Sequence, residues 1–225
     1  MKKMFIGLIF ILLTTFNGFA LSFGGGWVYE MGFSSVTVKA PNGAYHDRAS
    51  TTGRGFFFFL DMTYLEATLG FPSFSLEPDG NPHSYDYALD GYDWKSMTLG
   101  LYGKIPIELD YDWTLFPMFG FDIQFFQEES VGGNTFYRDD LSYSGLPDDY
   151  YDDVWFRAGL GLDFYIDGWL LLRGEFLWGI KFNNQYEKDY ISWLGNGADG
   201  YFKGNPSADL FTHGPQFRLS AGIHF

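Results

Sequence analysis

The sequence predicts an all-β fold, an eight-stranded antiparallel up-and-down transmembrane β-barrel with short periplasmic turns and long extracellular loops. Three observations indicate it. Aromatic residues make up 22% of the 225 residues, yet beyond the N-terminal stretch no apolar run approaches the roughly 20 residues of a transmembrane helix. Apolar and polar residues instead alternate with a period of two in eight segments. The connections between these segments are alternately short and long, as in transmembrane barrels.

Residues 1–20 have the features of a cleaved signal peptide. Lys2 and Lys3 are basic, residues 4–13 are apolar, and small residues, Gly18 and Ala20, flank Phe19. We expect cleavage after Ala20, export from a bacterial cytoplasm, and a single domain formed by residues 21–225. An uncleaved N-terminal membrane anchor is the alternative.

Four segments in the first half are the weaker strand predictions: residues 22–33, 55–60, 64–71 and 95–102. Four segments in the second half alternate more regularly: residues 113–125, 154–165, 170–182 and 216–225. Pro117 lies inside one of them and cannot donate to a sheet hydrogen bond, so we expect a bulge there.

The connections alternate in length. Short links are expected at residues 61–63, 103–112 and 166–168, and long ones at residues 34–54, 72–94, 126–153 and 183–214. Both chain ends then lie at the rim with the short turns. In a closed ring every backbone polar group can be paired, which the interior of a bilayer requires.

The last strand carries a resemblance. Its apolar residues share one face and end on an aromatic residue: Phe217, Leu219, Ala221, Ile223 and Phe225. With the signal peptide and the alternation, this resembles the small eight-stranded outer-membrane barrels, the class of the OmpA transmembrane domain and OmpX. The resemblance is architectural and covers residues 21–225. It implies a place in the bacterial outer membrane, contact with outer-membrane lipid, and a C-terminal signal that the barrel assembly machinery reads.

A soluble, lipocalin-like barrel is the competing fold, with the apolar face turned inward. The apolar face of the last four strands is almost free of charge, whereas the opposite face mixes glycine with acidic and basic residues. Such a face would make a poor apolar core, so the membrane barrel is favoured.

The polar face predicts a charged interior. Nine ionisable residues point inward by parity: Glu30, Asp61, Glu66, Asp122, Arg157, Asp163, Arg173, Glu175 and Arg218. Because an eight-stranded barrel has room only for side chains, we expect salt bridges that plug it. Arg218 could reach Glu30 or Glu175. The alternative is a gated pore. The same count points several apolar residues inward: Phe57, Phe59, Phe116, Leu171 and Leu177.

The long loops are acidic and aromatic. Three acidic pairs lie in residues 139–153, which fits either a calcium site or, more commonly, a solvated acidic loop. Exposed tyrosine and tryptophan residues are good contact residues, so an extracellular ligand or a host surface is a possible partner.

The composition excludes other classes. The net charge is −14, from 28 acidic and 14 basic residues, which argues against nucleic-acid binding. There is no cysteine, so disulfides and cysteine zinc sites are excluded. No metal or nucleotide motif is present, and we expect no cofactor.

An enzyme that modifies lipid A would need a serine, a histidine and a carboxylate close together. The chain has four histidines, His46, His83, His213 and His224, with no motif spacing. His213 is the least unsuitable candidate, and we expect no catalysis. The sequence thus predicts a monomeric, surface-exposed outer-membrane barrel with a structural or interaction role. A narrow pore for small solutes is the first alternative and the lipid A-modifying enzyme is the second.

Overall fold

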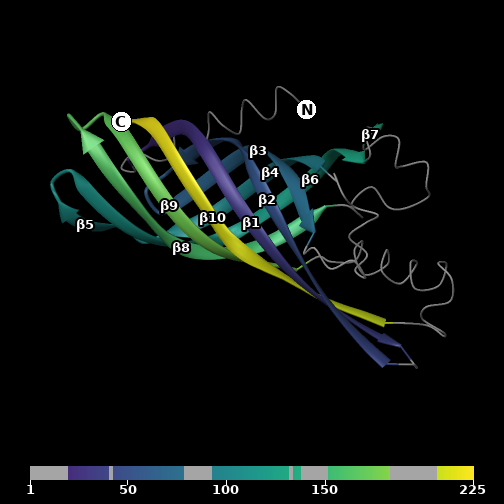
Figure 1. Cartoon of the computed structure of the whole chain (residues 1–225). Helices are drawn as coiled ribbons and strands as arrows, with labels where there is room; N and C mark the ends of the chain where they lie inside the picture. Colours follow the sequence, from purple (N-terminus) through teal and green to yellow (C-terminus); the bar gives the residue numbers. More distant parts are fainter. Residues whose placement is uncertain (1–19, 41–42, 79–92, 132–133, 138–151, 183–206) are drawn as a thin grey trace, which may run out of the picture.

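The structure is a computed structural model, and it describes residues 20–40, 43–78, 93–131, 134–137, 152–182 and 207–225. The expected signal peptide, residues 1–19, lies outside this part. The described residues form ten strands (Figure 1), with these bounds: β1 (Ser22–Ala40), β2 (Gly43–Asp61), β3 (Leu65–Pro78), β4 (Asp93–Lys104), β5 (Ile107–Asp110), β6 (Trp113–Val131), β7 (Asn134–Tyr137), β8 (Asp153–Ile166), β9 (Leu170–Lys181) and β10 (Ser207–His224).

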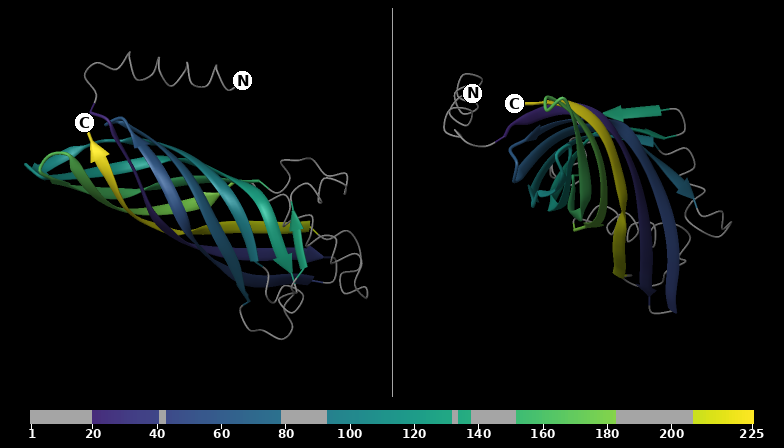
Figure 2. Two further views of the ribbon diagram at one scale, coloured as in Figure 1. Left: turned by 90° about the horizontal axis from the view of Figure 1, so that it is seen from above. Right: turned by 90° about the vertical axis from the view of Figure 1, so that its left-hand side faces the viewer.

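Eight of these strands close into an antiparallel barrel. They follow the order β4-β3-β2-β1-β10-β9-β8-β6, and pairing of β4 with β6 closes the ring. The two short strands, β5 and β7, pair only with the ends of β6. Figure 2 shows the slanted strands that wrap the cylinder. The predicted fold class is therefore confirmed.

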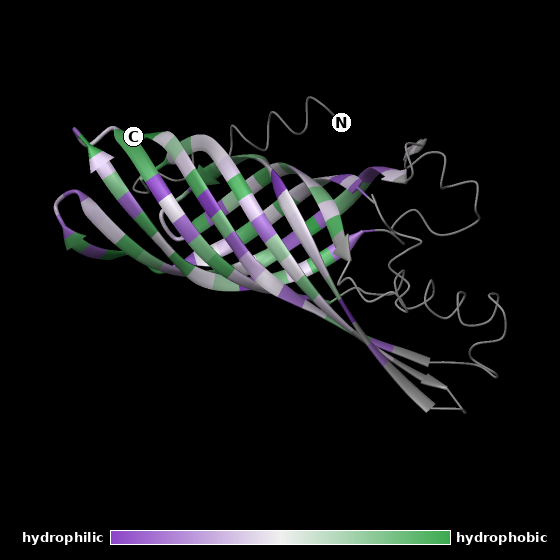
Figure 3. Ribbon diagram, in the orientation of Figure 1, coloured by the Kyte–Doolittle hydropathy of each residue, from purple (hydrophilic) through white to green (hydrophobic). Residues whose placement is uncertain are grey.

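Alternation sets which residues face outward. On β10, Phe217 and Leu219 are 44% and 70% exposed, whereas Arg218 between them is 3% exposed. Figure 3 shows the same alternation of hydrophobic and hydrophilic residues along most of the strands. Because successive side chains of a strand point to opposite faces, the apolar set covers the outside and the polar set fills the interior.

The start of β1 and the end of β10 meet at the rim with the tight turns. The backbone N–H of Phe225 donates to the carbonyl of Leu21 at 2.9 Å. The β8–β9 turn lies at the same rim, and its central residues Asp167 and Gly168 both have positive φ, 53° and 73°. This is the backbone of a two-residue type I′ hairpin turn, for which Asp-Gly is a favoured sequence. The predicted short link at residues 166–168 is confirmed.

The predicted long connection at residues 34–54 is wrong. β1 and β2 pair continuously from Ser22 with Asp61 out to Ala40 with Gly43. Strands β3, β6 and β10 also extend beyond their predicted ends at this rim. Alternation could not reveal these extensions because strands that project beyond the lipid need no apolar face. The rest of the expected long loops, residues 79–92, 138–151 and 183–206, lies outside the described residues.

The bulge expected at Pro117 is also absent. Pro117 pairs with Leu160 of β8 in unbroken register, and its carbonyl accepts from the N–H of Ile105 at 3.0 Å. In an antiparallel ladder the N and C=O of one residue face the same neighbour, so the proline nitrogen faces the gap between β4 and β5, where no donor is needed. Register shifts lie instead between Lys95 and Ser96 of β4 and between Glu108 and Asp110 of β5.

Among the described residues, no helix is long and apolar enough to cross a membrane.

Candidate functional site: the barrel interior

The structure brings all nine predicted interior charges into the lumen. Each is at most 5% exposed, and they come from seven of the eight barrel strands. A charge removed from water is costly unless it is paired and hydrogen-bonded, so the pairing decides whether this interior is stable.

Arg157 organises the half of the lumen nearer the long strand extensions. It is fully buried and donates from Nε to Asp122 at 2.7 Å and from Nη2 to Glu30. Glu30 also accepts from the amide of Gln216 at 2.9 Å. Arg157 therefore joins β8 to β1 and β6 across the lumen.

Arg173 has the same role nearer the rim with the tight turns. It donates from Nε to Asp163 at 2.6 Å and from its other nitrogens to Glu66 and Asp61. Lys104 donates to Asp61 as well and lies 3.7 Å from Glu66. These five residues come from five strands, so their pairing ties distant parts of the wall together.

Arg218 lies between the two groups and is held more loosely. It donates to the hydroxyl of Tyr102 at 2.7 Å, and its nitrogens lie 3.5 Å from Asp122 and 3.6 Å from Glu175. The expected pairing with Glu175 is thus present as an ion pair. The expected pairing with Glu30 is wrong, because the register places Arg218 opposite Val28, and Arg157 takes Glu30.

Aromatic rings cover the cations. Lys104 lies 4.4 Å from the centre of the Phe116 ring, and Arg157 lies 4.5 Å from Trp155. Arg218 lies 4.7 Å from Tyr102. Cation–π attraction is strongest where water is excluded, so these rings partly replace lost hydration.

Apolar side chains fill the space between the charges. The five predicted inward residues, Phe57, Phe59, Phe116, Leu171 and Leu177, are all at most 4% exposed. They form two clusters, one with Val28 and the other with Tyr102 and Met118. The lumen is therefore packed with both apolar side chains and ion pairs.

Sequence reasoning missed three polar residues of this interior: Tyr102, Lys104 and Gln216. Lys104 lies in the predicted short link at residues 103–112, although it has the same parity as Tyr102 and continues β4. The polar pattern of β4 and the Gln-x-Arg sequence at Gln216 could have revealed them. The polar face of the predicted strand at residues 113–125 did include Gln124, which lies in the lumen beside Glu30.

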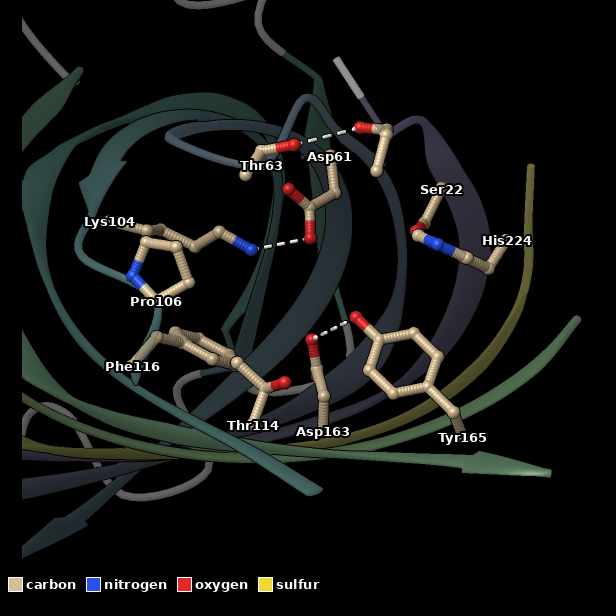
Figure 4. A pocket seen from close by; sticks show the side chains of 11 residues that line it. Ser22, Asp61, Thr63, Lys104, Pro106, Thr114, Phe116, Asp163, Tyr165 and His224 are labelled. Carbon is tan, nitrogen blue, oxygen red and sulfur yellow. Dashed lines mark hydrogen bonds and ion pairs between the residues drawn. The ribbon is translucent and has the colours of Figure 1, made fainter. Parts of the chain in front are cut away.

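Two cavities lie at the ends of the interior. A cavity of about 60 Å³ opens near the tight-turn rim (Figure 4), where Asp61, Lys104, Asp163 and Tyr165 point toward one another. A larger cavity of about 720 Å³ lies toward the opposite end and is lined by residues of β1 to β4, β6 and β7. Its lining includes Phe74 and Trp94, and it also reaches Arg54, Ser73 and Lys95. Between the two, Arg157, Tyr102, Asp122 and Leu177 are at most 1% exposed.

Three histidines are described, His46, His213 and His224, and their contacts form no serine–histidine–carboxylate triad. His46 Nδ1 contacts the hydroxyl of Thr37 at 3.0 Å. His213 packs among the rings of Phe33, Trp178 and Phe211. His224 Nδ1 contacts the hydroxyl of Ser22 at 2.8 Å, and its ring packs edge-on against Tyr165. This serine–histidine contact ties the first strand to the last. In the described part of the chain, no carboxylate lies within 4 Å of either of these two histidines.

Most of the acidic stretch considered for calcium, residues 138–151, lies outside the described residues. Of the two aspartates that are described, Asp152 accepts from the N–H of Phe126 at 3.2 Å, and Asp153 pairs with Lys181 at 2.7 Å. Both are thus engaged in holding β8 to its neighbours.

The apolar series of the last strand faces outward as predicted. Phe217, Leu219, Ala221, Ile223 and Phe225 are all exposed, and Phe225 stacks on Phe23 of β1 with ring centres 5.8 Å apart. The series thus lies on the surface where the first and last strands join.

No protein-family model matches the chain, and no curated protein matches its sequence. Solved structures do resemble it. The outer membrane protein OprG from Pseudomonas aeruginosa is 12% identical over 92% of this chain and 96% of its own, with a TM-score of 0.50.

Two further structures have lower scores. The N-terminal β-barrel domain of Pseudomonas aeruginosa OprF is 8% identical over 90% of this chain and 99% of its own, with a TM-score of 0.40. Neisserial surface protein A is 9% identical over 89% and 97%, with a TM-score of 0.38. The chain has the fold of the small eight-stranded outer-membrane barrels.

Proposed function

We propose that this chain is an integral outer-membrane barrel that is closed across its middle and acts through its extracellular end. The observation that carries the proposal is the packed layer between the two cavities. There, Arg157, Asp122 and Glu66 are 0% exposed, and they are surrounded by rings and ion pairs. A solute that crossed this layer would have to break several buried charge pairs at once.

The outward apolar surface supports a place in the membrane. Leu160 and Phe176, on adjacent strands of the wall, are 51% and 44% exposed and lie opposite each other. Exposed apolar area of this extent requires an apolar solvent, and a closed barrel leaves no unpaired strand edge to it. We infer that the outward series of β10, ending at Phe225, is read by the assembly machinery after residues 1–20 are removed.

The interaction role rests on the far end of the barrel. There the strands project past the apolar surface, and the connecting segments contain acidic and aromatic residues such as Asp148, Tyr150 and Trp193. We infer that these segments contact an extracellular ligand or a host surface. Acidic, aromatic-rich loops suit a partner with both charge complementarity and apolar contact area.

A narrow pore is the second candidate. The observation in its favour is a group of buried polar atoms near Arg218 that lack hydrogen-bond partners. Both carboxylate oxygens of Glu175, together with Oε1 of Glu66 and Nη1 of Arg218, make no hydrogen bond to described groups. Arg218 lies within 3.7 Å of three carboxylates, Glu66, Asp122 and Glu175. Rearrangement of Arg218 among them would be the route by which such a pore opens.

Cysteine labelling tests the outward display. The chain has no cysteine, so Thr135→Cys on β7 and Tyr111→Cys at the opposite rim each provide a unique thiol. In intact cells, a maleimide on a polymer too large for porins is expected to label Thr135→Cys alone. After the outer membrane is permeabilised, both variants should react. Labelling of Tyr111→Cys alone in intact cells would reverse the proposed orientation, and labelling of neither would contradict surface display.

A further inference from the structure

The outward face changes from apolar to polar at one register row on three successive strands. Phe56 of β2 lies opposite Phe71 of β3, and both are about half exposed. The next outward row holds Arg54 opposite Ser73, and Ser73 in turn lies opposite Lys95 of β4. A guanidinium, a hydroxyl and an ammonium therefore border the apolar surface side by side.

Arg54 and Lys95 differ from most described cations of this chain because they are exposed on the outward face. Five of the basic residues, Lys104, Arg157, Arg173, Lys181 and Arg218, are buried on the inward face. On the outward face, the described residues carry exposed cations at Arg48, Arg54 and Lys95, all on β2 and β4 and all toward the extracellular end. A chain with a net charge of −14 thus gathers outward positive charge in one sector at the edge of its apolar surface.

The row is available to a ligand. The guanidinium of Arg54 makes no hydrogen bond or ion pair with any described group. Lys95 pairs with Glu128 at 2.6 Å but is 63% exposed, and an ammonium has three donors, so it can bind a second acceptor. Neighbouring strands lie about 4.8 Å apart, so Arg54 and Lys95 are about 10 Å apart with Ser73 between them.

We propose that the row Arg54–Ser73–Lys95 binds the phosphate of an outer-leaflet lipid whose acyl chains lie over Trp27, Phe56 and Phe71. Trp27 packs on Phe56 with ring centres 3.9 Å apart, which gives the acyl chains a broad aromatic surface next to the cations. Arginine matches phosphate oxygens with two parallel hydrogen bonds, and the serine hydroxyl adds another donor. This site is separate from the extracellular segments invoked above.

Lipid binding by the refolded mature chain in neutral detergent tests the site. The probe is fluorescently labelled lipid A, compared with the same lipid after removal of its phosphates, and affinity is read from fluorescence anisotropy. Wild type is expected to prefer the phosphorylated lipid. The double variant Arg54→Gln/Lys95→Gln should bind it at least about tenfold more weakly, because each surface cation contributes about 1 kcal/mol near anionic lipid.

Two further variants separate the site from general charge. Arg54→Lys/Lys95→Arg keeps the cations and should retain most of the affinity. Arg48→Gln removes one cation farther out on the same strand and should bind as wild type, whereas Arg54→Gln alone should already bind more weakly. The characteristic shift of folded barrels on unheated gels verifies that each variant has folded.

Three results would overturn the proposal. The double variant could bind phosphorylated lipid A as tightly as wild type. Wild type could bind the dephosphorylated lipid equally well, which would leave only apolar contact. Inorganic phosphate at millimolar concentration could displace the lipid completely, which would make the row a site for free anions rather than for a lipid.

Discussion

At the scale of single residues, Arg157 carries the most consequential contacts. It is fully buried, it pairs with Glu30 and Asp122, and it covers the Trp155 ring. Arg157→Met keeps the bulk but leaves the buried Glu30 without its cation and Asp122 with only the longer contact to Arg218 at 3.5 Å. We expect a loss of about 3–5 kcal/mol in the free energy of unfolding, measured by urea titration in micelles.

Two further variants test whether the loss of stability comes from the unpaired buried charges. Lys95→Met breaks the exposed pair with Glu128 and should change stability by less than about 1 kcal/mol. The triple variant Arg157→Met/Glu30→Gln/Asp122→Asn removes the unpaired charges and should regain part of the loss. An Arg157→Met barrel as stable as the parent would show that this interior does not depend on its ion pairs.

At the scale of strands, β10 completes the ring and presents the apolar series that ends at Phe225. Phe225→Ala is expected to lower the amount of barrel assembled in the outer membrane of cells several-fold, while refolding of the purified chain into micelles continues. The physical reason is that Phe225 lies at the seam and adds mainly exposed surface, so its loss affects recognition more than packing. The gel mobility of unheated and heated samples measures the folded fraction, both in membrane fractions of cells and in the refolded protein.

Phe119→Ala on β6 is the matched control, because Phe119 is similarly exposed, at 55%, but lies away from the chain end. It should assemble normally. Equal defects in both variants, or none in Phe225→Ala, would remove the basis for a C-terminal signal in this chain.

The strands also show what alternation can reveal. Parity placed Arg157, Glu66 and Phe116 in the lumen correctly, because successive side chains in the wall of a membrane barrel face either the lipid or the interior. It did not show the outer parts of β1 and β2, where water lies on both sides. It also could not assign partners, because reach across the lumen depends on strand tilt. Arg218 and Glu30 lie on the last and first strands, which pair with each other, yet each binds other residues.

Across the whole barrel, acidic and basic residues are distributed unevenly. The interior pairs its carboxylates with arginine and lysine and so holds the wall together. The excess of acidic over basic residues, 28 against 14, therefore falls largely in the connecting segments and at the rims. The outward cations of β2 and β4 fit between these two regions, at the lipid boundary.

Single-channel recording in a planar bilayer tests most directly whether the middle of the lumen is closed. The mature chain is refolded and inserted, and the inserted amount is measured by protease protection, so that an absence of current cannot come from failed insertion. A closed lumen predicts an inserted barrel without discrete current steps. Steady, repeatable steps of one size would contradict it, and Arg218 and its carboxylates would then line a conducting pathway.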